Sequence, residues 1–530
     1  MSTAFAGFLA NRREAILQVL LIVGSLAALT FTANQFLWRA DLTENNRYTL
    51  ASASHEIARD LEDPVTVTAY FSGNLPSRFG QTKQEFRALL QEFRAAADGN
   101  VEFTFVNPNE SDDKAQEAQQ AGVRPIMIDV RQRNKMTQKR AFLGAVFQYQ
   151  GDRKVIPLVE PGSALEYTIA STLRSLTQES KAVLGLLQGH GEPKPDAIPQ
   201  LRDALKDRYE IKELSNVNTG GVPSDVDVLM VARPENTLSS ETALAIDQYV
   251  MRGGRVLFAL NRAKAQPRTN RAQTQTTGLE PLLDTYGLPI ESNLVRDRNA
   301  TAVRIRQQRG GFNMVNRVRY PYIPTVSTFS DHAISSGLDQ AVFRFVSSLD
   351  TTTVDTASAN LTVLARSSSQ SATASLPTGI SPQQEWTISD FSGSSYPIAG
   401  LLEGTFSSAF ADTDTLSVER TKSAETKLVV VGDGDFLVNG SGERKQRLPS
   451  GNINLVANSI DYLADDTGLM GLRTQRVTSR PLMQLKPTTK TILKYLNVLL
   501  PILIVVGYGL FRYRRNQTRR RRWKEEGVPA

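Results

Sequence analysis

Two apolar runs, one near each end of the 530-residue chain, frame a long segment in which polar and apolar positions alternate. The first run covers about 15–37 and carries no charge, and the second covers about 492–511 and contains Pro501. At 1.5 Å per residue, each is long enough to cross a hydrocarbon layer of about 30 Å. The pattern therefore predicts two transmembrane helices, at 15–37 and 492–511.

A cleaved signal peptide is the competing interpretation of the first run. Its apolar core would be shorter, and a small-residue cleavage site would follow it. Residues 34–38 read Asn-Gln-Phe-Leu-Trp, which is a poor cleavage context, and Trp38 suits a membrane interface. The sequence favours a retained helix.

Charge sets the expected orientation of these helices. The tail 512–530 holds eight Arg or Lys and two Glu, so it contributes +6 of the net charge of +7. Basic residues beside a membrane span favour the cytoplasmic side, and they also attract anionic lipid. We expect 1–14 and 512–530 to be cytoplasmic, 40–490 to lie outside a cytoplasmic (inner) membrane, and nucleic acid not to be a partner.

Residues 41–178 predict a first extracytoplasmic domain of mixed α/β type. A helix at 52–61, with Thr49 or Ser52 as its cap, precedes a strand–helix–strand unit whose strands are 64–71 and 101–106. Further strands are expected at 125–130, 141–149 and 154–158, and the order resembles a thioredoxin-like domain without its CxxC.

Residues 179–480 predict a second domain, a doubly wound parallel sheet like those of flavodoxins and amidotransferases. Its expected strands are 181–187, 209–214, 226–232, 255–260 and 427–432, and its helices are 197–207, 239–252, 279–286 and 452–462. Ser239 is the expected cap of the second helix, and 262–278 reads as an exposed loop. A Ser/Thr-rich insertion near 301–425 is expected before the last strand.

The chain has no cysteine, which excludes disulfides, thiolate metal sites and a cysteine nucleophile. It also contains no GxxxxGK[ST] motif, so ATP hydrolysis by this chain is not expected. A serine elbow of the GxSxG type is absent as well. We expect no cofactor and no enzymatic activity.

His190 and Glu192 are the sharpest candidates for a ligand site. They follow the first strand of the second domain, at the edge where open α/β sheets bind ligands. The pair could bind a ligand or move a proton. The alternative is a tight turn in which Gly189 and Gly191 serve the backbone.

Asp433 and Asp435 follow the last predicted strand in the sequence Gly-Asp-Gly-Asp-Phe. Two carboxylates at that spacing could hold a cation. Aspartates beside glycine also form turns, and this is the favoured interpretation. The three histidines are scattered along the chain, so no metal centre is expected.

Several short motifs together resemble the gliding-motility-associated ABC transporter auxiliary proteins, the GldG-like family. They lie at 41–43, 47–50, 63–65, 70–76, 189–193, 245–255, 431–436 and 458–463, and they include Gly-His-Gly-Glu-Pro and Gly-Asp-Gly-Asp-Phe. The resemblance implies an auxiliary membrane subunit beside a separate permease and a separate ATPase. It implies no reaction and no ligand residues.

Two alternatives to the transporter subunit remain open. One is a membrane-tethered binding protein for glycan or peptidoglycan that acts without a transporter. The other is an extracytoplasmic hydrolase, for which the sequence offers no obvious nucleophile.

Overall fold

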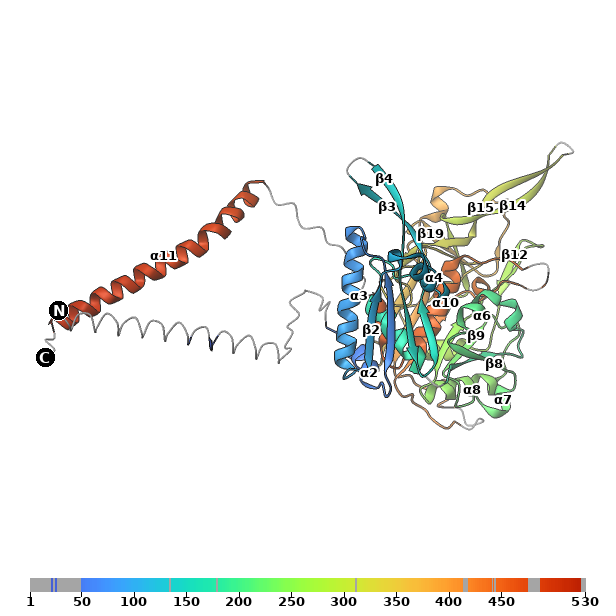
Figure 1. The fold of residues 1–530 in the computed structure, drawn as a ribbon. Coiled ribbons are helices and arrows are strands. Elements are labelled where there is room, and N and C mark those ends of the chain that lie inside the picture. The colour runs from blue at the N-terminus through green and yellow to red at the C-terminus, as the bar shows by residue number, and fades with distance from the viewer. Residues whose placement is uncertain are drawn as a thin grey trace, which may run out of the picture. The chain divides into compact units, whose positions relative to one another are not determined.

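The computed structural model describes residues 49–132, 135–177, 180–309, 312–412, 418–440, 442, 445–474 and 487–525, together with 21, 24 and 25. The chain divides into a body, Met1–Arg476, and a second unit, Val477–Ala530. Figure 1 shows the body as a mixed α/β structure with several sheets. The predicted segment 1–14 and nearly all of the predicted span 15–37 lie outside the described residues.

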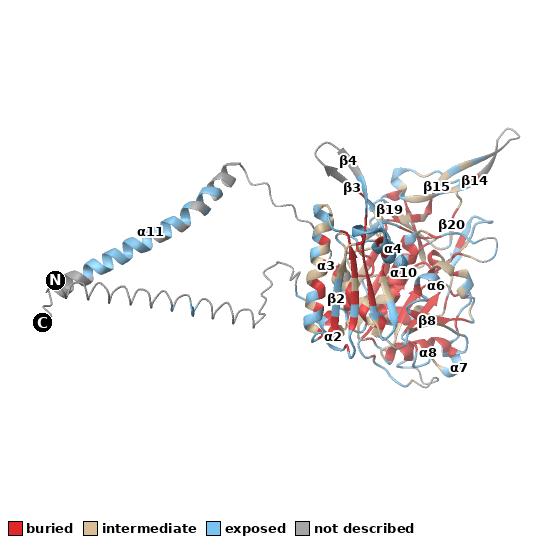
Figure 2. Cartoon of the chain, in the orientation of Figure 1, coloured by how far each residue is buried: buried red, intermediate tan, exposed pale blue. Residues whose placement is uncertain are grey.

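The second unit is described as one helix, α11 (Pro487–Glu525), which joins the apolar run 492–511 to the basic segment after it. Figure 2 shows that its described residues are exposed. A search of the described residues finds no helix with the length and apolar character needed to cross a membrane. The structure thus leaves both predicted spans without support.

The first part of the body is built on a four-stranded sheet in the order β2-β1-β5-β6. Its strands are β1 (Val65–Phe71), β2 (Val101–Val106), β5 (Leu143–Tyr149) and β6 (Asp152–Ile156). β1 and β2 are parallel, and β5 and β6 are antiparallel to their neighbours. The parallel pair is joined by α3 (Ser77–Ala96), which buries Phe86, Leu89, Leu90 and Phe93 as their helical spacing predicts.

Two details of this part differ from the sequence prediction. The strand expected at 125–130 is β3 (Ile126–Gln132), but it pairs only with β4 (Lys135–Ala141) in a separate hairpin. The helix α2 (Ser52–Arg59) has Ala51 at its N-cap, so the predicted caps Thr49 and Ser52 are wrong. In place of a side-chain cap, the Ala51 N–H donates to the Glu166 carboxylate at 2.7 Å.

The second part is an eight-stranded sheet in the order β16-β18-β21-β22-β10-β9-β7-β8. Five strands are parallel, as predicted: β7 (Ala182–Leu187), β8 (Tyr209–Leu214), β9 (Val228–Ala232), β10 (Arg255–Ala259) and β22 (Thr426–Val431). The late strand β22 pairs directly with β10, 172 residues earlier at Val256↔Leu428 and equivalent positions. The prediction that it completes the sheet is confirmed.

Helices cover both faces of the eight-stranded sheet. Alternate residues of β10 point to opposite cores, so Leu257 packs with α6 (Pro199–Leu205) and α10 (Ser450–Leu463). Phe258 packs on the other face with α8 (Ser240–Met251) and α9 (Glu280–Tyr286). Ser239 caps α8 as predicted, because its hydroxyl accepts the Thr242 N–H at 3.3 Å.

Three strands of the Ser/Thr-rich segment belong to the same sheet. Its strands β16 (Thr328–Phe329), β18 (Ala359–Arg366) and β21 (Pro397–Gly404) extend the sheet antiparallel from β22. It also supplies a long hairpin, β14 (Ala300–Arg309) with β15 (Phe312–Val326), and the short strands β13 (Asn293–Asp297), β17 (Ala341–Val342), β19 (Ser371–Ser375) and β20 (Thr378–Gly379). The loop expected at 262–278 contains a hairpin, β11 (Ala263–Gln266) with β12 (Arg271–Thr274). The short strands β19 and β20 consist of small residues, which carry little periodic signal.

The segment after α10 packs against the first part of the body. After α10, the short 3-10 helix η6 (Leu469–Thr474) buries Leu469 and Leu472 in the core of the first part. There it packs against α5 (Leu165–Thr177), which also contacts α2. Within 49–474, the first and last described helices of the body therefore both contact α5.

Candidate functional site

The candidate residues gather at the carboxyl edge of the parallel strands. β7, β9, β10 and β22 are neighbours in the sheet, and each ends in a loop with polar side chains. In strand order these are His190 and Glu192, Arg233 and Glu235, Asn261, and Asp433 with Asp435. Parallel strands bring their carboxyl ends to one edge, so the fold itself assembles this set.

The His190 loop is held mainly by its backbone. The Glu192 carboxylate, almost wholly buried, accepts the His190 N–H at 2.7 Å and lies 3.2 Å from the ring Nδ1. The His190 carbonyl in turn accepts the N–H groups of Glu235 and Asn236. Gly191 has a φ of +89°, and a Cβ there would lie 2.9 Å from the Glu235 Cβ. The predicted alternative, a turn shaped by glycine, therefore describes how the loop is built.

Asp433 is completely buried and organises the turn after β22. It accepts the backbone N–H of Arg344 at 2.6 Å, that of Asp435 at 2.7 Å and that of Phe436 at 3.3 Å. Burial, and then the nearby charge of Asp435, raise the pKa of Asp433 to about 8. This carboxyl group shapes its own turn and ties it to the segment of Arg344, the turn role that the sequence favoured.

Arg233 links the two candidate pairs and was missed by the sequence analysis. Its guanidinium lies 3.2 Å from Asp435 and 3.0 Å from Glu235, and Asn261 donates to Asp435 at 2.9 Å. The backbone N–H of Glu235 in turn donates to the His190 carbonyl. The signal that could have revealed Arg233 is its position directly after β9, at the same sheet edge as His190.

Two features of Arg233 are typical of ligand sites. Its φ is +48°, a left-handed conformation that is unusual for arginine and that collects at functional positions. Its Nε is buried and has no hydrogen-bond partner among the described residues. A buried N–H without an acceptor is unfavourable, and a ligand oxygen could satisfy it.

The chemical capacity of this edge is that of a polar binding surface. The four predicted residues form two pairs, joined through Arg233, Glu235 and Asn261 and not by direct contact. Within the described residues, no group of three His, Asp or Glu side chains is arranged to hold a metal ion.

A second candidate surface lies at the opposite, amino edge of the same strands. A cleft of about 530 Å³ opens there between the first and second parts of the body. Residues from both parts line it, among them Arg153 and Arg174 from the first and Arg208, Tyr209 and Asp461 from the second. Asp461 accepts from Tyr209 at 3.0 Å and pairs with Arg208, and burial raises the pKa of the Tyr209 hydroxyl.

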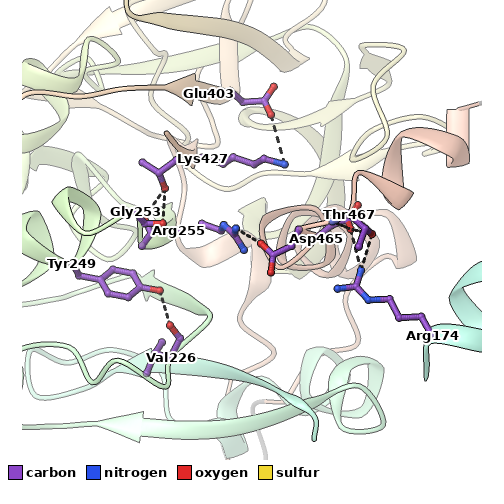
Figure 3. A network of polar contacts seen from close by, with 12 residues as sticks. Arg174, Val226, Tyr249, Gly253, Arg255, Glu403, Lys427, Asp465 and Thr467 are labelled. Carbon is purple, nitrogen blue, oxygen red and sulfur yellow. Dashed lines mark hydrogen bonds and ion pairs between the residues drawn. The ribbon is translucent and has the colours of Figure 1, made fainter. Parts of the chain in front are cut away.

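A polar network closes one side of this junction (Figure 3). Arg174 of α5 lies 3.1 Å from Asp465, which also accepts from Thr467. Next to it, Arg255 at the start of β10 pairs with Asp466. The turn after α10 thus connects the two parts of the body.

Comparison with known proteins decides the family. A family profile described as an ABC-type uncharacterized transport system matches residues 181–462, just over half of the chain. The chain belongs to this family. Family membership gives it an accessory, transport-associated role and implies association with other components of a transport system.

Further similarities extend the match without adding a function. Residues 44–148 match a domain of unknown function. An uncharacterized protein of Borreliella burgdorferi is 22% identical over 526 residues, which cover 96% of this chain and 99% of that protein. The similarity to that protein therefore spans almost the whole of both chains.

Two solved structures match this chain at low similarity. The mmIFT52 N-terminal domain covers 53% of this chain and 97% of its own, with 14% identity and a TM-score of 0.33. A ThuA-like protein from Parabacteroides merdae covers 57% of this chain and 93% of its own, with 11% identity and a TM-score of 0.28. At these TM-scores, neither similarity bears on function.

Proposed function

We propose that this chain is a non-catalytic auxiliary subunit of an ABC transport system of the gliding-motility type, beside a separate permease and a separate ATPase. The match of residues 181–462 to an ABC transport family carries the proposal. In this proposal the apolar runs 15–37 and 492–511 anchor the chain in the cytoplasmic membrane. The body then lies outside, and both termini are cytoplasmic.

The path of the chain through the body supports two anchors on one membrane. α2 and η6, the first and last described helices within 49–474, both pack against α5. Leu469 and Leu472 of η6 share the hydrophobic core that also holds Ala53 and Ala58 of α2. Because this part of the chain begins and ends against one helix, its path is compatible with two anchors on the same membrane.

The first part of the body supports a thioredoxin-like assignment. Its order β2-β1-β5-β6 combines one parallel βαβ unit with an antiparallel hairpin, and α5 follows the last strand. The chain has no cysteine, so this domain would act as a binding or spacing module.

The carboxyl-edge residues and the cleft supply two surfaces for a substrate or partner. The Nε of Arg233 offers a buried donor at the first. The second is lined by both parts of the body, and junctions between domains commonly form ligand sites.

Affinity purification of the tagged full-length chain from its own membranes, in a mild detergent, tests the central claim. We expect an ATPase and a multi-span permease to co-purify in reproducible ratio. Recovery of the chain with neither would refute the transporter role and favour the tethered binding protein.

Anchoring needs its own test, because it can fail independently. We expect the wild-type chain to stay in the membrane pellet after carbonate extraction. Leu499→Arg combined with Ile504→Arg should prevent insertion of the second anchor, since each arginine near the centre of a span disfavours insertion by about 2.5–3.5 kcal/mol. The run 15–37 would still keep this variant in the pellet, so the readout is a tag on the tail 512–530, which should become accessible to protease added outside the membrane. Tyr513→Arg, beyond the apolar run, is the matched control and should leave the tag protected.

The His190 loop is tested by function in the cell. His190→Ala removes the ring but keeps the backbone contacts that hold the loop, so the fold should be retained. Loss of transport-dependent growth or movement with normal protein levels would support a ligand role. Full activity would leave the loop with a purely structural role.

A further inference from the structure

Two long antiparallel hairpins extend from the body. The first arm is β3 with β4, residues 126–141, and the second arm is β14 with β15, residues 300–326. Figure 1 shows both arms extending past the rest of the body at the top of the view. They come from different parts of the body, yet they share two chemical features.

The first shared feature is concentrated positive charge. Together the arms contain ten Arg or Lys and one acidic residue, Asp129, for a net charge of +9 in 43 residues. The whole chain has a net charge of +7, of which 512–530 contribute +6. The remaining residues are therefore net acidic by eight charges, so the arms are strongly basic relative to the rest of the chain outside 512–530.

The arginines of the second arm face one another without a counter-charge. Arg304 is directly opposite Arg317 in the strand register. Arg319, which is opposite Ala302, is the next residue of β15 on the same exposed face. The structure records no ion pair between these three side chains and any described carboxylate. Like charges directly across an antiparallel pair are destabilising, so an external anion would relieve this arrangement.

The second shared feature is an exposed apolar side chain beside the charge. Met127 of the first arm and Val315 of the second are 63% and 60% exposed. Among residues described between 49 and 474, the other large apolar side chain exposed to this degree is Ile388, at 72%. In the strand register Met127 is opposite Arg140, and Val315 is opposite Arg306.

We propose that the two arms form a contact surface for an anionic lipid bilayer. The guanidinium and ammonium groups bind headgroup phosphates, and Met127 and Val315 enter the boundary between headgroups and acyl chains. Cationic and apolar side chains on one exposed element are the combination that holds proteins at such interfaces. Two separate arms with the same chemistry suit an extended surface better than a single acidic pocket. The inference is independent of whether the chain serves a transporter.

The absence of cysteine makes a direct test simple. Val315→Cys, Met127→Cys and Ile388→Cys each create a single labelling site in the full-length chain. Each is labelled with an environment-sensitive dye and reconstituted into vesicles that contain a nitroxide-labelled lipid. Ile388 is the matched control, since it is exposed and apolar but does not lie on an arm.

We expect nitroxide quenching at positions 315 and 127 to be at least twofold stronger than at 388 in vesicles containing phosphatidylglycerol. Pure phosphatidylcholine vesicles and added salt should abolish the difference, because the attraction is electrostatic and screened. Arg304→Gln, Arg317→Gln and Arg319→Gln combined should remove quenching at 315 but not at 127. Circular dichroism confirms that this variant folds.

Several outcomes would overturn the proposal. Equal quenching at 315 and 388 is one, and equal quenching in anionic and neutral vesicles is another. If position 315 stays unquenched in lipid vesicles but becomes protected in native membranes, the arm binds a protein instead. None of these outcomes depends on whether an ATPase co-purifies, so this inference and the proposed function can fail separately.

Discussion

The guanidinium of Arg174 and the carboxylate of Asp465 form an ion pair at 3.1 Å across a sequence separation of 291 residues (Figure 3). The same carboxylate accepts the Thr467 N–H at 3.1 Å and the Met470 N–H at 2.7 Å. One buried side chain therefore shapes the turn after α10 and fixes it to α5. This contact brings the end of the body back to its first part.

Asp465→Ala should destabilise the body by about 2–3 kcal/mol, because it leaves two backbone N–H groups and the partly buried Arg174 without their acceptor. Asp466→Ala is the control. Its partner Arg255 is similarly placed, but the Asp466 side chain is 64% exposed, so about 1 kcal/mol or less should be lost. Urea unfolding of both variants measures the difference. Equal losses would show that Asp465 does not hold the junction.

Asp247 is a buried acceptor at the centre of the second core. It accepts from the Tyr286 hydroxyl at 2.9 Å, the Ser408 hydroxyl at 2.7 Å and the Ala409 N–H at 3.0 Å. Asp247→Ala should lower the free energy of unfolding by about 3–5 kcal/mol, since several buried donors lose their partner at once. Tyr286→Phe removes one donor and keeps the ring, so we expect about 1–2 kcal/mol.

Thermal unfolding by circular dichroism compares the Asp247 and Tyr286 variants. A larger loss for Tyr286→Phe than for Asp247→Ala would contradict the assignment of Asp247 as the shared acceptor. Soluble yield provides a second reading, because a marginal variant accumulates less protein in cells.

Asp433 should make stability depend on pH. Its pKa is about 8 in the folded body, against an ordinary value of 3.8 for an aspartate, so the folded state holds a proton that the unfolded chain releases. Its contribution is fully present below about pH 4 and is lost as the pH rises through 8. The free energy of unfolding should fall between pH 5 and 8, by at most about 1.4 kcal/mol per pH unit for one proton.

Asp435→Asn tests how much the negative charge of Asp435 adds to that pH dependence, beside the larger effect of burial. Removing the neighbouring negative charge lowers the pKa of Asp433, so the decline between pH 5 and 8 should become shallower. Asp225→Asn is the control, because Lys212 lowers the pKa of Asp225 and it titrates below this window. Urea titrations at each pH give the slopes, and an unchanged slope in Asp435→Asn would contradict the coupling.

Gly191→Ala should destabilise the His190 loop through a steric clash as well as through backbone strain. The new Cβ would lie 2.9 Å from the Glu235 Cβ, in addition to the positive φ of +89°. Gly221 also has a positive φ, +68°, but open space around its Cβ, so Gly221→Ala measures strain alone. We expect Gly191→Ala to be less stable than this control by about 1–3 kcal/mol, the range typical of overpacking. Equal stability would mean that the loop shifts freely away from Glu235.

Sequence patterns identified the elements with strong local signals. Five parallel strands and the helices between them were predicted because continuous apolar runs and helical spacing mark buried α/β elements. The cap at Ser239 followed from local hydrogen-bond chemistry, which acts over three residues. The short strands β19 and β20 of the Ser/Thr-rich segment were not predicted, since their small residues carry little periodic signal.

The sequence alone placed His190, Glu192, Asp433 and Asp435 at strand ends. That placement needs only the rule that parallel strands expose their carboxyl ends at one edge. The same rule places Arg233 at this edge, directly after β9, but its left-handed φ and its buried Nε without a partner among the described residues are visible only in the tertiary structure. Contacts that depend on neighbours distant in sequence have no local signature.

What the sequence determined and what the tertiary structure decided differ for a physical reason. Periodicity, capping and charge act over a few residues, so the sequence by itself determined the parallel strands, their helices, the two apolar runs and the positive charge of the arms. Pairing across 291 residues, as between Arg174 and Asp465, depends on how the whole chain closes. Only the tertiary structure decided that α2 and η6 meet on α5, that Arg304 faces Arg317, and that Asp433 lies wholly buried.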